Sequence, residues 1–420
     1  MLVESGPGLL SSLRELPKHL NLLTLSHGFV GWVFSITGPV LILLSVAEKG
    51  GLPSEITISW IFIGLSVGGA ASWLLSLYYR QPLTVAITIP GMVLVGTALT
   101  HFKFAEVVGA YLVTGGLLIL IALSRKIKPV MEWFPLPIAM AMVAGVFLPF
   151  GLNIISAWAT NPSVSIPTTL VFMVISFFSL WAKTFPPILG AILAGIVMAA
   201  ATGQTRGELF HFDFARLTWA SPVWSLAAVT ELSVPLLLTV VAVQNAQGAM
   251  VLRIAGYRPP LNAMTWTCGV GTVINSIFCC PPACVTGPVS AIISPSSAGP
   301  SEGRYAAGIV VGTLWLISGI LAPLVVVMSI VLPANLINLL AGLALFPVLA
   351  NAFYEGFKGK FRLGALACFM ITVSQVTIWN VGAPFWGLLI GLLVSALMER
   401  QDFEPSPQSE SKDPDVKESG

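Results

Sequence analysis

Charged side chains are scarce in this 420-residue chain: Asp, Glu, Lys and Arg together make up 9% of it, whereas 56% of the residues are hydrophobic. A soluble domain of ordinary composition carries roughly 25% charged residues. So low a share excludes an ordinary soluble protein and predicts that most of the chain lies in lipid. The net charge is only +2, which argues against nucleic acid as a partner.

Cysteines are few as well, and the sequence shows no catalytic pattern. The five cysteines sit in or beside apolar stretches, so we expect no disulfide framework. Cys279, Cys280 and Cys284 form a tight cluster, but no His or carboxylate joins it, so close helix packing explains it better than a metal. No nucleophile, base and orienting group converge in the pattern. We therefore expect neither an enzyme nor a cofactor.

Long apolar runs dominate the chain and predict an all-α polytopic membrane protein. A bilayer core needs about 20 apolar residues per helix, and no short apolar run with a cleavage site precedes the first span, which we take as retained. We count fourteen transmembrane segments, near residues 22–47, 56–79, 84–100, 104–123, 135–153, 166–182, 186–202, 226–252, 261–278, 282–295, 305–331, 333–353, 363–380 and 384–398. The third and tenth are too short and too broken for ordinary helices, and we expect each to contain a short strand.

The distribution of charge orients these segments. With the N-terminus inside, 16 of the 20 Lys and Arg residues fall on the cytoplasmic side, as the positive-inside rule requires. Seven segments per half is an odd number, so the halves form 7+7 inverted repeats. The expected organisation is a cytoplasmic segment 1–21, a first repeat 22–202, an extracytoplasmic connecting loop 203–225, a second repeat 226–398 and a disordered cytoplasmic tail 399–420. We expect a multi-pass protein of the cell (inner) membrane with both termini cytoplasmic.

Two distant places break an apolar run in the same way. Residues 84–89 lead into Pro90-Gly91, and residues 282–286 lead into Gly287-Pro288. Pro90 and Gly287 are 197 residues apart, and the same offset relates Ala144-Gly145 to Ala341-Gly342, Pro187 to Pro384 and Gly190 to Gly387. A constant offset across several helices implies a duplicated half. Pro/Gly interruptions at matching places in two halves are the best pointer in a sequence to a transporter site.

The two breaks predict a binding site at the membrane centre. Backbone groups cannot stay unpaired in lipid, so the two extended segments most simply pair with each other. Half-helices that begin at the two breaks point their positive dipole ends at the centre, where they attract an anion. We therefore expect one substrate carboxylate to be held at Thr88, Pro90, Gly91, Thr286, Gly287 and Ser290. The alternative is that the Pro/Gly pairs only kink packed helices.

Amide side chains interrupt the eighth segment at Gln244, Asn245 and Gln247. Amides in an apolar run are costly unless they have partners, and the broken strands or a ligand can supply them. We expect Gln244 and Asn245 to contact the substrate. The alternative is that these amides join neighbouring helices, as polar residues often do in membrane bundles.

Ionisable residues inside the apolar runs are few. Glu231 lies several residues inside the eighth segment, and His27 lies in the cytoplasmic third of the first. An intramembrane ionisable residue is a functional hypothesis by default, so both are candidates for proton coupling. The simpler interpretation is that both are interfacial and wet. In that case the proton crosses on the substrate carboxylate itself.

Four stretches resemble the benzoate/proton symporters of the BenE type, which are related in fold to uracil/xanthine and sulfate permeases. These stretches run from Gln81-Pro82 to Pro90-Gly91, from Pro137 to Gly151, from Pro235 through Gln244-Asn245 to Pro260, and from Ala341 to Leu345 with Phe385 to Leu388. The resemblance covers nearly the whole membrane region. It implies a secondary transporter that moves an aromatic or other small organic carboxylate with a proton.

The chain departs from that family in places near the expected pocket. Gln247 stands where the family usually has Pro, and the runs Cys279 to Cys284 and Trp379 to Gly382 are altered. These differences concern the substrate rather than the fold. An uncoupled anion carrier or channel, and a nucleobase-type permease on the same scaffold, remain alternatives. The expected partners are the organic anion, protons, the lipid bilayer and a second copy of the chain in a homodimer.

Overall fold

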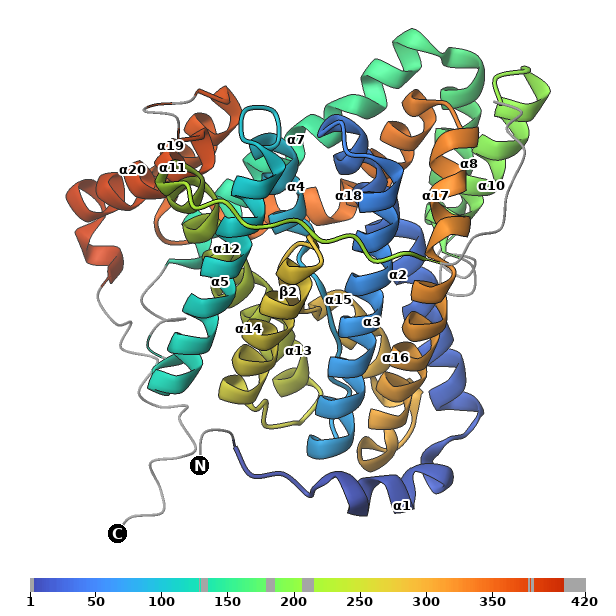
Figure 1. Ribbon diagram of the computed structural model, residues 1–420, viewed down its shortest axis with the longest axis vertical. Helices are drawn as coiled ribbons and strands as arrows, with labels where there is room; N and C mark the ends of the chain where they lie inside the picture. Colours follow the sequence, from blue (N-terminus) through green and yellow to red (C-terminus); the bar gives the residue numbers. More distant parts are fainter. Residues whose placement is uncertain are drawn as a thin grey trace.

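The computed structural model describes residues 4–127, 129, 135–178, 186–205, 215–376, 378 and 381–403. The protein is a bundle of helices around one small sheet (Figure 1). Seven described helical stretches are long and apolar enough to cross a bilayer: Leu22–Lys49, Ser54–Tyr79, Phe104–Ser124, Leu136–Thr160, Leu226–Ile254, Ser301–Ile320 and Ala334–Phe357. Five shorter apolar helices accompany them. The chain is therefore a polytopic membrane protein of helical fold.

The elements of the first part of the chain are α1 (Leu9–His19), α2 (Leu22–Lys49), α3 (Ser54–Tyr79), β1 (Val85–Ile87), α4 (Ile89–Ala98), α5 (Phe104–Ser124), α7 (Leu136–Thr160), α8 (Pro162–Phe177) and α10 (Pro187–Ala201). Those of the second part are α11 (Leu226–Ala228), η1 (Val229–Ser233), α12 (Val234–Leu238), η2 (Thr239–Asn245), α13 (Ala246–Ile254), α14 (Leu261–Ile277), β2 (Ala283–Val285), α15 (Gly287–Ile293), η3 (Ser296–Ala298), η4 (Ser301–Gly303), α16 (Tyr305–Ile320), α17 (Ala322–Val331), α18 (Ala334–Phe357), α19 (Arg362–Ser374), α20 (Ala383–Met398) and η5 (Arg400–Phe403).

The two strands lie side by side in the middle of the molecule. They pair antiparallel, with Val85 opposite Val285 and Ile87 opposite Ala283. Two flanking hydrogen bonds extend the ladder: the Thr88 N–H donates to the Pro282 carbonyl and the Thr286 N–H donates to the Thr84 carbonyl, each at 2.9 Å. The extended segments of the two sequence breaks thus pair with each other. Each strand leads directly into a short helix, α4 or α15.

Side chains from neighbouring helices satisfy the outer edges of this sheet. The Val85 N–H donates to the Ser72 hydroxyl at 2.9 Å, and the Ala283 N–H donates to the Thr272 hydroxyl at 3.0 Å. The Val285 N–H donates to Oδ1 of Asn245 at 3.0 Å. An unpaired backbone group in an apolar interior costs several kcal/mol. These polar residues therefore allow an edge-bearing sheet to exist inside a helical membrane bundle.

The helices form two packed groups. In one group α7 packs against α18 and α19, α19 against α20, and α8 against α10. In the other, α3 packs against α16 and α5 against α14, around the paired strands. Figure 1 shows α19 and α20 at one side of the molecule and α8 and α10 at the other. Helix α2 contacts both α16 and α18, so it lies where the two groups meet.

The eighth apolar run is one continuous helix that widens twice. The π-helical stretches η1 and η2 interrupt it at residues 229–233 and 239–245. Pro235 follows the first of them. A proline inside a helix has no N–H for the carbonyl four residues earlier, and its ring would clash with that carbonyl. Widening around Glu231 relieves this conflict. π-Helical turns are frequent at functional sites.

Three segments show detail that the sequence did not predict. The eleventh run divides into α16 and α17 instead of forming one span. The N-terminal segment contains a helix, α1, which Arg80 ties to α3 through an ion pair with Glu15 at 2.7 Å. Residues 399–403, expected to be disordered, include the 3₁₀ turn η5, and the Asp402 carboxylate accepts the Phe361 N–H at 2.7 Å. Residues 206–214 of the connecting loop and residues 404–420 of the tail lie outside the described residues.

Candidate functional site

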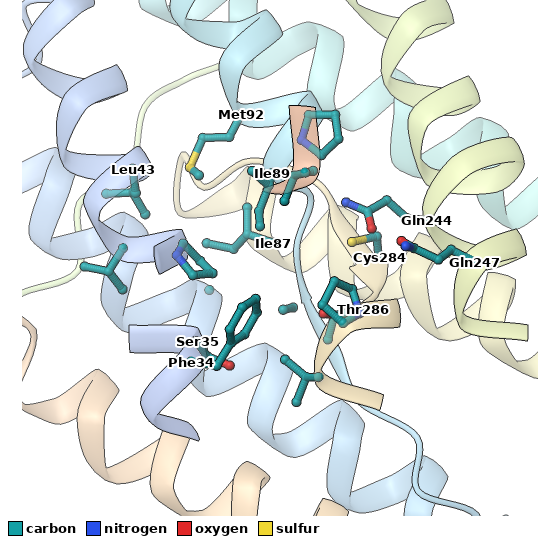
Figure 2. A pocket seen from close by; sticks show the side chains of 18 of the residues that line it. Phe34, Ser35, Leu43, Ile87, Ile89, Met92, Gln244, Gln247, Cys284 and Thr286 are labelled. Atoms are coloured by element: carbon teal, nitrogen blue, oxygen red, sulfur yellow. The ribbon is translucent and has the colours of Figure 1, made fainter. Parts of the chain in front are cut away.

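A cavity of about 320 Å³ lies where the paired strands meet the interface of the two helix groups. We call it the central cavity. Its wall includes Ile87 of β1, Cys284 of β2, Thr286 just after β2 and Gln244 of η2. The start of α4 and parts of α2, α7 and α18 complete it. Figure 2 shows Gln244, Gln247, Cys284 and Thr286 grouped at one wall, with Phe34, Leu43 and Met92 across from them.

Helix α4 begins at this cavity. Ile89 and Pro90 line it, so the positive end of the α4 dipole faces the space. Thr88 is fully buried, and its hydroxyl accepts the Gly91 N–H at 3.3 Å as the cap of α4. The Thr88 side chain therefore organises the helix end and does not line the cavity. Helix α15 begins at the same cavity, but it is only seven residues long, or about two turns, so its dipole is weaker.

Two glutamines give the cavity most of its hydrogen-bonding capacity. Gln244 and Gln247 both line it, and no described residue hydrogen bonds with either side chain. They are three residues apart, a spacing that places two side chains on one helix face. Thr286 adds a hydroxyl to the same wall. Gln247 was not among the expected site residues, although the helical spacing could have identified it.

The other expected residues lie beside the cavity and hold its wall in place. Asn245 braces β2 through the Val285 N–H. The Ser290 hydroxyl bonds with that of Thr84 at 3.1 Å, so it joins α15 to the segment before β1. A Cβ at Gly287 would lie 2.7 Å from Cγ of Gln247, so the glycine lets α13 and α15 approach closely. Gly91 is likewise a packing position, close to Thr88 and Leu236.

The central cavity is almost uncharged. None of the described side chains that line it is Asp, Glu, Lys, Arg or His. Apart from Ser35 and Asn351, most of its remaining surface is aliphatic or aromatic, including Phe34, Met92, Phe147 and Trp315. Ligand sites commonly combine such an apolar wall with a few placed polar groups. This one can enclose a flat apolar body and hydrogen bond with one polar end of it.

A second cavity of about 210 Å³ follows the first along the same helices. We call it the Lys49 cavity. On α4, Met92 lines the central cavity and Val93 lines the Lys49 cavity; on α7, the corresponding neighbours are Phe147 and Val146. The second cavity is lined by Val46, Lys49, Val93, Gly96, Thr97, Thr100, His101, Gly145, Val146, Pro149, Phe150, Thr372, Gln375, Gly382, Ala383 and Pro384. The two cavities are thus successive spaces at one interface.

Glu231 lies behind the wall of the Lys49 cavity. Its side chain is only 4% exposed, and its Oε2 lies 3.0 Å from Nε2 of His101. The carboxylate also lies close to Gly382, where a Cβ would come within 2.5 Å of its Oε1. Glu231 is therefore buried and paired, and not wet as the simpler interpretation had it. Sequence reasoning missed His101, since its partner is 130 positions away in the chain.

His27 is not brought into either cavity. Its Nδ1 lies 3.0 Å from the Leu23 carbonyl and its Nε2 lies 3.1 Å from the Ser297 hydroxyl. It occupies the opposite end of α2 from Lys49, roughly 33 Å away at the rise of an α-helix. The five cysteines are all free and buried. No cluster of three or more His, Cys, Asp or Glu side chains suited to a metal occurs within the described part of the chain.

Comparisons with known sequences give one matching family and two relatives that cover most of the chain. The family described as benzoate membrane transport protein matches residues 18–397. The benzoate membrane transport protein of Acinetobacter baylyi is 27% identical over 395 residues, which cover 91% of this chain and 96% of that protein. The inner membrane protein YdcO of Escherichia coli is 27% identical over 374 residues, which cover 88% of this chain and 94% of that protein.

Solved structures share the fold at much lower sequence identity. The transmembrane domain of a cyanobacterial bicarbonate transporter, BicA, has a TM-score of 0.59 at 14% identity, covering 90% of this chain and 98% of that domain. The murine Solute Carrier 26 family member A9 anion transporter, in its inward-facing state, has a TM-score of 0.60 at 13% identity, covering 94% of this chain and 71% of that one. At such identities the likeness concerns the fold alone.

Proposed function

The chain belongs to the family of benzoate membrane transport proteins, and on that premise we propose that it carries a small aromatic carboxylate, such as benzoate, across a membrane together with a proton. That it is a multi-pass membrane transporter and not an enzyme follows from the family itself. The observation that carries the proposed substrate is the central cavity: an apolar space with two glutamine amides and a helix N-terminus at one wall.

In the proposed complex the aromatic ring lies against Phe34, Leu43 and Met92. The carboxylate faces Gln244, Gln247 and the N-terminus of α4. Amide donors and a helix dipole suit a single negative charge, and they need no buried Lys or Arg. Thr286 supplies one further donor. The remaining expected residues, Thr88, Gly91, Asn245, Gly287 and Ser290, contribute by fixing the two strand–helix segments around the substrate.

The proposed architecture is fourteen membrane segments in 7+7 inverted repeats, with the third and tenth built from β1–α4 and β2–α15. The antiparallel pairing of β1 with β2 supports it. So does the packing of α7 against α18, two long helices that each contain a proline, Pro149 and Pro347. Pro149 lines the Lys49 cavity and Pro347 lines the central cavity, as expected for two halves of one path. Both termini would then be cytoplasmic, in the inner membrane, and a homodimer is the proposed assembly.

Transport by the purified full-length protein in liposomes tests the function. We expect uptake of labelled benzoate above its equilibrium level when the outside is acidic, and no such accumulation when a protonophore collapses the gradient. Uracil, xanthine, bicarbonate and aliphatic acids complete the panel. Equilibration without accumulation would identify an uncoupled carrier. Uptake of a nucleobase in place of benzoate would refute the substrate class.

A further inference from the structure

The Lys49 cavity carries the charge that the central cavity lacks. The exposed Lys49 side chain reaches it at the end of α2, and its Nζ lies 5.5 Å from the ring centroid of Phe150, which also lines the space. Lys49 forms no ion pair with any carboxylate of the described residues. An ammonium beside an aromatic face, with hydroxyls from Thr97 and Thr100 and the amide of Gln375 around it, is a set of groups suited to an aromatic carboxylate.

The Glu231 carboxylate contacts residues that line this cavity, although it does not line the cavity itself. Glu231 bonds with His101 and lies against Gly382, and both of these residues line the space. Gly382 permits the contact because of its size: a Cβ there would lie 2.5 Å from Oε1 of Glu231. Glu231 belongs to η1, whereas Gly382 precedes α20 in the other packed group. The carboxylate therefore joins the two groups at the edge of the cavity.

The other titratable groups near Glu231 are few. The elements packed against η1 are α4, α5, α11, α12 and α20. His101 follows α4, Lys103 is the N-cap of α5, and Glu106 and Tyr111 belong to the first eight residues of that helix. The Glu106 carboxylate accepts the backbone N–H of Lys103 at 2.9 Å as a helix cap. Helices α11, α12 and α20 carry no Asp, Glu, His, Lys, Arg or Tyr. His101 is thus the titratable group in direct contact with Glu231.

We propose that the Lys49 cavity is a second binding site for an aromatic carboxylate and that Glu231 takes up the proton that accompanies this anion. The proposal rests on the proposed function, because it assumes that a carboxylate is the cargo. The anion binds beside Lys49 and His101, where the Glu231 carboxylate repels it. One proton from water then adds to a carboxylate oxygen of Glu231, so one negative charge at the site replaces another. By reciprocity, protonation of Glu231 strengthens binding of the anion.

Proton uptake on binding tests the role of Glu231. Benzoate is added to the full-length protein in lipid nanodiscs in weak buffer with a pH indicator. We expect the wild type to take up close to one proton for each anion bound at this site, as the linkage requires. Glu231→Gln should still bind benzoate, without proton uptake and with an affinity that no longer falls as pH rises. The matched control Glu106→Gln should behave as the wild type. Undiminished proton uptake by Glu231→Gln would overturn the proposal.

Equilibrium dialysis with labelled benzoate tests the site itself. In a Gln244→Leu background, which weakens the central cavity, we expect residual binding that Lys49→Gln reduces about tenfold, as loss of a charged hydrogen-bond donor predicts. Lys103→Gln, an exposed lysine outside both cavities, is the control. Residual binding that Lys49→Gln leaves unchanged would refute the second site while the central one stands. A wild-type protein that neither binds nor transports benzoate would instead refute the proposed function.

Discussion

The central cavity and the Lys49 cavity share three helices yet differ in chemistry. Both are lined by α2, α4 and α7. The first is enclosed by mostly apolar side chains with the amides of Gln244, Gln247 and Asn351, whereas the second carries Lys49 and His101 and is backed by Glu231. An apolar wall recognises the body of a ligand, and fixed charges recognise its sign. At one interface, the central cavity therefore suits the aromatic ring of a ligand, and the Lys49 cavity suits its charge.

The step between the cavities is short. Adjacent residues of α4, Met92 and Val93, face different cavities, and so do Phe147 and Val146 of α7. Phe147 and Met92 are at most 1% exposed, so they close the space between the two. Proteins keep such a division because packed side chains leave no void large enough for a substrate.

The largest expected effect is all-or-none labelling from opposite membrane faces. Asn351 lines the central cavity and Thr100 lines the Lys49 cavity, and both side chains are exposed. In intact cells a membrane-impermeant thiol reagent should label Thr100→Cys and spare Asn351→Cys, which should react only after permeabilisation. The native cysteines are buried, and the unsubstituted protein measures their background. Labelling of both variants from one face would show that the two cavities open to the same side of the membrane as a single vestibule.

Replacing the amide of Gln244 should reduce uptake next most strongly. Gln244→Leu removes a donor from the central cavity, and a hydrogen bond to a charged group is worth about 1.5–3 kcal/mol, or roughly ten- to a hundredfold in apparent affinity. Its thermal unfolding should stay close to that of the wild type. Radiolabelled uptake and a melting curve measure both.

Asn245→Leu is the contrasting variant for that experiment. It leaves the Val285 N–H without its acceptor, and an unsatisfied buried donor costs about 1–3 kcal/mol. We therefore expect a lower melting temperature with this variant and not with Gln244→Leu. Equal loss of stability in the two variants would show that Gln244 is also a structural residue.

A smaller effect is expected where Glu231 meets the neighbouring helix group. Gly382→Ala places a Cβ 2.5 Å from Oε1 of Glu231, so the carboxylate must shift. We expect a several-fold fall in proton-driven uptake, because the shift weakens the bond between Glu231 and His101, while exchange of internal for external benzoate persists. A matched Gly359→Ala, at a glycine whose Cβ would meet open space, should have no effect. If Gly382→Ala accumulated benzoate as the wild type does, the contact between Glu231 and Gly382 would have no role in proton coupling.

The smallest effect concerns a carboxylate far from both cavities. Partial burial opposes ionisation of Glu399, but N–H donors of Leu363 and Gly364 and the Ser395 hydroxyl outweigh it, so the pKa of Glu399 is lowered. A lowered pKa means stabilisation that is present above the ordinary Glu value and lost as pH falls through the folded value. Glu399→Gln should cost roughly 0.5–1 kcal/mol at neutral pH, as for a helix cap, and less in acid.

Benzoate uptake is the second measurement on Glu399→Gln. It should remain at the wild-type level, in contrast to the effect of changing Glu231. A loss of pH-dependent transport in Glu399→Gln would mean that titration outside the two cavities also drives coupling.

Some structural roles of individual residues could be predicted from the sequence and others could not. The pairing of β1 with β2 could be expected, because backbone groups in lipid need partners and the two breaks recur at one offset. The role of the Thr88 hydroxyl as a helix cap could not be expected, because the same group can cap a helix or bind a ligand. Gln244 and Gln247 share a helix face, while the intervening Asn245 faces β2. Contact of Glu231 with His101 required folding of distant segments.

Composition, period and offset are enough to predict that the chain lies in a membrane, that two strand–helix breaks recur in it, and that amides interrupt one apolar helix. These properties act locally or by repetition along the chain. Which polar groups line a cavity and which brace the sheet depends on the folded arrangement, and so does the meeting of Lys49, His101 and Glu231. A side chain's role depends on what its neighbours leave unsatisfied, and those neighbours come from distant parts of the chain.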